Sequence, residues 1–71
     1  MSLDSVILCK NSNGINIIAT GEYSKLSKMM PFYRKISGGN EIKLVSTSGI
    51  DIENVIKEQK LIDNTFRSHF S

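Results

Sequence analysis

The sequence has few residues that could carry catalytic chemistry. It contains one histidine, one cysteine and no tryptophan in 71 residues. His69 lies two residues from the C-terminus, where chains usually fray. Cys9 belongs to the apolar run 6–9, where a thiol more often packs than reacts. No carboxylate pair shows the burial pattern that separates two pKa values. We therefore expect no catalytic residues, and we expect that the protein is not an enzyme.

The same scarcity excludes covalent and metal cross-links. One cysteine cannot form an intramolecular disulfide, and one histidine with one cysteine cannot supply the four ligands of a structural zinc site. We expect no metal and no other cofactor. A domain of this size buries only about 60% of its unfolded surface. Its stability must therefore come from a good core, an oligomer or a bound partner.

Long hydrophobic runs are also missing. The apolar run 6–9 has only four residues, far short of the roughly 20 of a membrane span. Residues 1–4 lack the basic region and the long apolar region of a signal peptide. A free cysteine fits a reducing compartment. We expect a cytoplasmic protein that does not enter the membrane.

Two apolar runs, residues 5–10 and 15–20, indicate a β-hairpin. Asn13-Gly14 between them predicts a two-residue type I′ turn. The register that follows places Cys9 opposite Ile18 and makes both faces of the hairpin apolar. One face carries Val6, Leu8, Ile17 and Ala19, and the other carries Ile7, Cys9 and Ile18.

The rest of the chain predicts one further strand and two helices. Apolar residues at three- and four-residue spacing predict a helix over 22–36, with a kink or break at Pro31. Residues 41–46 alternate as a strand, and the capping-box spacing of residues 48–51 opens a helix that extends to Phe70. We predict a single small α+β domain over residues 1–71, of order ββαβα, with a three-stranded sheet. The third strand can pair with either the first or the second.

The segment 22–36 is the basic part of the chain. It carries four cations against Glu22 alone, and Lys25, Lys28 and Lys35 fall near one helical face. Clustered cations attract phosphates, and neighbouring aromatic rings can stack on bases. The alternative function is therefore a nucleic-acid-binding module; a solvated helix face explains the same charges. The candidate nucleic-acid contacts are Lys25, Lys28, Tyr33, Arg34 and Lys35.

The same segment contains Met29, Met30 and Phe32. Methionine side chains are flexible and suit a binding surface that adapts to its partner. Residues at this spacing also form ordinary helix cores. Both interpretations remain open from the sequence.

The second apolar face of the hairpin suggests a contact with another chain. Ile7, Cys9 and Ile18 project from it, and Val45 of the third strand lies beside them. Contiguous apolar patches mark contact sites. We predict that these four residues form a protein interface and that the protein is a homodimer. The alternative is that the C-terminal helix covers this face within one chain.

These observations together predict a small non-enzymatic interaction or regulatory protein, which acts through contact with a second protein. The composition, rich in Lys, Asn, Ile and Ser, and the single short domain without an active site resemble the small accessory proteins encoded by phages and prophages. The resemblance implies a modulator of a host or viral protein. It assigns no role to any residue.

Overall fold

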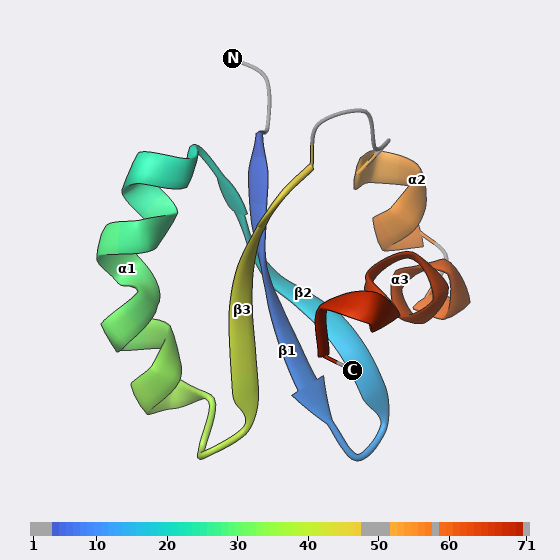
Figure 1. Cartoon of the computed structure of the whole chain (residues 1–71), viewed down its shortest axis with the longest axis horizontal. Helices are drawn as coiled ribbons and strands as arrows, with labels where there is room; N and C mark the ends of the chain where they lie inside the picture. Colours follow the sequence, from blue (N-terminus) through green and yellow to red (C-terminus); the bar gives the residue numbers. More distant parts are fainter. Residues whose placement is uncertain (1–3, 48–51, 58, 71) are drawn as a thin grey trace.

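The computed structural model describes residues 4–47, 52–57 and 59–70. Its centre is a three-stranded antiparallel sheet of order β2-β1-β3 (Figure 1). The strands are β1 (Ser5–Asn11), β2 (Gly14–Gly21) and β3 (Glu41–Ser46). The third strand pairs with the first, which settles the question that the sequence left open.

Helices cover both faces of the sheet (Figure 1). One face is covered by α1 (Tyr23–Ile36). The other is covered by α2 (Ile52–Lys57), α3 (Gln59–Phe66) and a short 3-10 helix, η1 (Arg67–Phe70). The predicted α+β class and ββαβα order are confirmed, although the last helical region is divided into these three pieces. The predicted capping box at 48–51 lies outside the described residues.

The central position of β1 explains its continuous apolar run. A strand that has helices on both faces buries every side chain, so its sequence does not alternate. Residues 5–9 are all buried. Val6 and Leu8 face α2 and α3, whereas Ile7 and Cys9 face α1.

Two apolar clusters follow from this arrangement, one on each side of the sheet. The first contains Val6, Leu8, Ile15, Val45, Val55, Ile62 and Phe66, with Ile17 and Phe70 packed against it. The second contains Ile7, Cys9, Leu26 and Ile42, with Ala19, Met30, Tyr33 and Leu44 packed against it.

The hairpin turn differs from the prediction. Asn11 pairs with Gly14, so the turn residues are Ser12 and Asn13. Among the described residues only glycines have positive φ, which excludes a type I′ turn with its two positive φ angles. The side-chain Oδ1 of Asn11 instead accepts the Asn13 N–H at 2.8 Å, an Asx-type arrangement that supports the turn locally.

A β-bulge in β2 changes which residues share a face of the sheet, so part of the predicted face assignment is wrong. Ile7 pairs with Ala19 and Leu8 pairs with Ile17, which leaves Ile18 as an extra residue. One extra residue exchanges the two faces of a strand beyond that point. Ala19 therefore packs with Ile7 and not, as predicted, on the face of Leu8.

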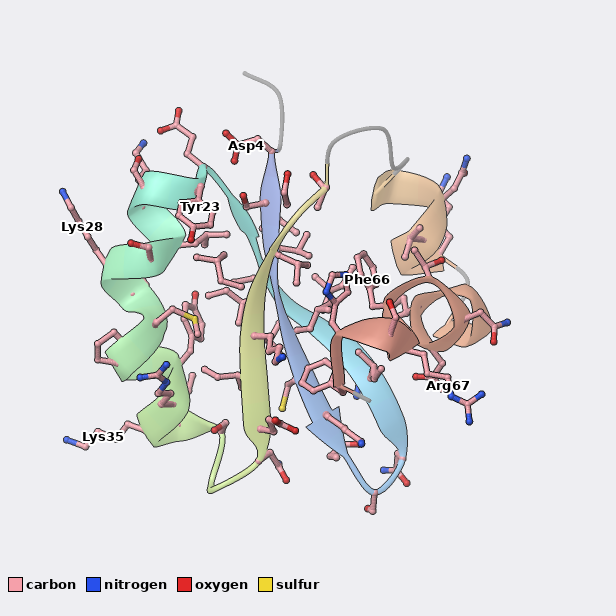
Figure 2. The ribbon with its side chains drawn as sticks, in the orientation of Figure 1. Asp4, Tyr23, Lys28, Lys35, Phe66 and Arg67 are labelled. Atoms are coloured by element: carbon pink, nitrogen blue, oxygen red, sulfur yellow. The ribbon has the colours of Figure 1, made fainter. Side chains whose placement is uncertain are left out.

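Asp4 joins the first helix to the sheet. Its Oδ1 accepts the Tyr23 N–H at 2.8 Å, and its carbonyl oxygen accepts the Thr47 N–H at 2.9 Å. Figure 2 shows Asp4 beside the start of α1. Glu22 at the N-cap makes no side-chain cap, so this carboxylate from outside the helix caps its first turn.

Pro31 does not interrupt α1, contrary to the predicted break. The helix continues through it to Ile36. Pro31 is exposed, while Leu26 and Met30 before it and Tyr33 after it pack against the sheet. These contacts anchor the helix on both sides of the proline, so the missing hydrogen bond is tolerated.

Candidate functional site

The predicted interface of Ile7, Cys9, Ile18 and Val45 is not a surface. Ile7, Cys9 and Val45 are buried, and only Ile18 is exposed, at 38%. Ile7 and Cys9 pack beneath α1, whereas Val45 belongs to the cluster on the opposite side. Helices thus cover both faces within one chain, with α1, and not the C-terminal helix, over Ile7 and Cys9. The homodimer stays a prediction, but Ile7, Cys9 and Val45 are too buried to form its interface.

The exposed apolar side chains lie instead on α1. Met29, Phe32 and Ile36 are 42%, 52% and 60% exposed. Their spacing of three and four residues places them along one side of the helix, and we call them the outer stripe. Leu26 is the only buried residue of α1. The helix therefore carries more apolar surface than the sheet covers, and such surface on a small protein indicates a contact site.

Lysines flank the outer stripe. Lys25 and Lys28 each lie four residues before a member of it, and Lys35 lies three residues after Phe32. Figure 2 shows Lys28 and Lys35 extending away from the sheet. Lys25 forms only a long exposed ion pair with Glu22, at 4.0 Å. The site therefore combines apolar side chains with hydrated positive charge.

The structure brings together only part of the predicted nucleic-acid site. Lys25, Lys28 and Lys35 lie on the outer side of α1. Arg34 is exposed, but its six-residue separation from Lys28 places it on a different side of the helix. Tyr33 is half-buried and packs against the sheet cluster, so its ring does not belong to the basic face. Phe32 is the exposed ring, in edge contact with Tyr33 at a centroid distance of 5.4 Å.

Of the sequence predictions, the adaptable binding surface at Met29, Met30 and Phe32 overlaps most with the outer stripe. Met29 and Phe32 are exposed, but Met30 packs against the sheet. Ile36 was missed because its spacing from Tyr33 matches that of a core residue. The helical period alone cannot show how far around the helix the sheet extends.

No three described residues of the His, Cys, Asp and Glu types lie close enough together to hold a metal ion. No described helix has the length and apolar character needed to cross a membrane. Comparisons with protein-family models, curated proteins and solved structures found no match for this chain.

Proposed function

We propose that this chain is a non-enzymatic protein-interaction module whose outer stripe binds an acidic amphipathic helix of another protein. The observation that carries the proposal is the exposure of Met29, Phe32 and Ile36 along one side of a helix whose adjacent side is already packed on the sheet. The domain itself does not bury these large apolar side chains. A partner that covers them would explain why they are apolar.

The exposed apolar area limits the affinity that the outer stripe can supply alone. Full burial of one such side chain from full exposure contributes about 1.5–3 kcal/mol. The three side chains are already about half buried, so covering the rest contributes roughly half of that sum. The loss of translational freedom and the ordering of side chains must still be subtracted. The partner must therefore add contacts beyond the three apolar side chains. Methionine and phenylalanine also tolerate small differences in partner shape.

The lysines determine the kind of partner. Complementary charge speeds association and excludes partners of like charge. Lys25, Lys28 and Lys35 therefore favour a segment that carries Asp or Glu beside its apolar residues. A helix with apolar residues at i, i+3 or i+4, and i+7 presents such a stripe to another helix. The resemblance in composition to phage accessory proteins supports a modulator that occupies a surface of a host or viral protein.

A synthetic peptide tests the proposal. The probe is a fluorescent amphipathic helix with leucines at i, i+4 and i+7 and glutamates at its flanks, and its matched control carries lysines in place of the glutamates. Fluorescence anisotropy should show saturable binding of the acidic peptide and little of the basic one. Phe32→Ser should weaken binding about tenfold or more, which corresponds to about 1.4 kcal/mol.

Charge reversal supplies a second comparison. Lys28→Glu should weaken binding of the acidic peptide. Lys57→Glu, an equal charge change at an exposed residue of α2, should not. If both variants weaken binding equally, the net charge of the protein and not the outer stripe binds the peptide. If the acidic and basic peptides bind alike, the proposal is wrong.

Nucleic-acid binding is the second candidate, favoured by the exposure of Phe32 among the same lysines. A fluorescent oligothymidine at about 50 mM salt distinguishes it, because phosphate contacts are strong at low salt and weaken steeply as salt rises. Tight, salt-sensitive binding that Lys28→Glu abolishes would favour this candidate over the protein partner. Apolar association with the acidic peptide depends on salt much less.

A further inference from the structure

A groove opens on the other side of the sheet, far from the outer stripe. It lies between the hairpin end of β1 and β2 and the C-terminal helices α3 and η1, and its volume is about 440 Å³. Pockets for small ligands are of this size. Figure 2 shows Arg67 at the outer edge of this region, below α3. The lining residues are Lys10, Gly14, Ile15, Asp63, Asn64, Arg67 and Phe70.

The groove has cations at its rim and apolar groups deeper in. Lys10 and Arg67 are exposed and Ile15 is buried, while Phe70 is half-buried against the apolar cluster. Lys43 adds a third cation, with its Nζ 6.0 Å from the centroid of the Phe70 ring. No carboxylate of the described residues lies within ion-pair distance of these three cations. Their exposed positions let them meet an anion from outside, and Glu41 lies opposite Lys10 in the sheet register.

Asp63 shapes one wall of the groove. Its Oδ1 accepts the Ile15 N–H at 2.5 Å, which ties α3 to the start of β2. Its Oδ2 accepts no hydrogen bond from any described residue. Asn64 lies next to it with a side-chain amide that can donate and accept. A carboxylate beside an amide can hydrogen-bond the hydroxyl groups of a ligand, whereas the carboxylate would repel an anionic group of the ligand.

We propose that this groove binds an organic monophosphate that carries a flat ring and hydroxyl groups, the chemistry of a mononucleotide. Lys10 and Arg67 hold the phosphate, for which a guanidinium is well shaped. Asp63 and Asn64 hydrogen-bond the sugar hydroxyls, and the ring lies against Phe70 as bases do on aromatic side chains. This site is independent of the outer stripe, and its ligand does not depend on the proposed protein partner.

Titration calorimetry of the whole chain tests the assignment. The probes are adenosine monophosphate, adenosine and inorganic phosphate. The monophosphate should bind saturably, and each of the other two should bind far more weakly, because each lacks half of the recognised chemistry. Arg67→Gln should weaken the monophosphate about tenfold, the effect of one charge-assisted hydrogen bond. Lys57→Gln, an equal charge loss on α2 outside the groove lining, should leave it unchanged, and thermal melts check that both variants fold.

A 5′-phosphorylated trinucleotide distinguishes the two sources of this chemistry. Binding of the monophosphate alone identifies a free nucleotide as the ligand, and binding of both probes identifies the end of a nucleic-acid strand. Each result supports the site if Arg67→Gln selectively weakens binding of the probe. The proposal is overturned if the monophosphate does not bind, if adenosine binds equally well, or if Lys57→Gln and Arg67→Gln have the same effect.

Discussion

The two sides of the sheet are packed to different degrees. On the side of α2 and α3, Val55, Ile62 and Phe66 are all buried, and Figure 2 shows Phe66 directed from α3 toward the sheet. On the other side, the 14-residue helix α1 has one buried residue, Leu26. Both sides are rich in apolar residues. They differ in how much of that apolar surface the chain itself covers.

The comparison separates stability from recognition. A narrow three-stranded sheet can cover only one side of a long helix, so the apolar residues beside the packed side of α1 remain in contact with water. The shorter helices meet the sheet with their large side chains and complete a core. The α2 and α3 side therefore mainly stabilises the fold, whereas the exposed apolar side of α1 is the surface that we propose for binding.

The largest effect is expected for Phe66→Ala. Phe66 has no exposed surface and lies in the larger apolar cluster. Truncation of a buried phenylalanine leaves a cavity and costs about 3–5 kcal/mol. Small domains have only about 5–15 kcal/mol of stability in total. Urea denaturation should therefore show a large loss, and a loss below about 1 kcal/mol would contradict the assignment of this side as the stabilising core.

Gly14→Ala should have the next largest effect. A Cβ on Gly14 would lie 2.6 and 2.7 Å from the two carboxylate oxygens of Asp63, and its φ of +124° is strained for any other residue. We expect a loss of more than about 1 kcal/mol. In the Asp63→Ala background the same substitution should cost less, because only the strain in φ remains. Additive losses in the double-mutant cycle would show that the carboxylate does not pack on Gly14.

This contact shows what the local sequence could and could not predict. Asn13-Gly14 correctly located a hairpin, and periodicity located α1 and β3 within one residue. The turn was misplaced because the Asx contact of Asn11 and the hydrogen bond from Ile15 to Asp63, 48 residues away, both act on it. A bulge at Ile18 has no local signal in a run of β-branched residues. The register and the faces beyond it were therefore beyond prediction.

The candidate site was predictable only in part. The sequence indicated the lysines of α1 and an adaptable group of Met29, Met30 and Phe32, of which Met30 packs against the sheet. It did not show that α1 lies on Ile7 and Cys9, because the pairing of β3 and the assignment of each helix to a face are long-range features. The groove at Arg67 joins segments about 50 residues apart, and no local motif marks it.

Asp4→Ala should have an intermediate effect. The substitution removes the acceptor for the Tyr23 N–H and the negative charge at the start of α1. Loss of a helix cap costs about 0.5–2 kcal/mol. Asp4→Asn keeps an acceptor and should recover most of this loss in a thermal melt. If the asparagine and alanine variants are equally unstable, the charge and not the hydrogen bond supports the helix.

Phe32→Ala should have the smallest effect on stability and forms a matched pair with Phe66→Ala. Phe32 is half-exposed on the outer stripe, and exposed substitutions usually change stability by no more than about 0.5 kcal/mol. Alanine also has the higher helix propensity. The same urea experiment measures both variants. A loss comparable to that of Phe66→Ala would place Phe32 in the core and remove the distinction between the two sides.

The most direct test of the central claim is a chemical-shift map of the isotope-labelled chain during titration with the acidic amphipathic peptide. The account predicts that the amides with perturbed chemical shifts gather on the outer side of α1, around Met29, Phe32 and Ile36. The chemical shifts of the amides of α3 and β1 should not change. Perturbation centred on α3 or spread evenly over the sheet would contradict it.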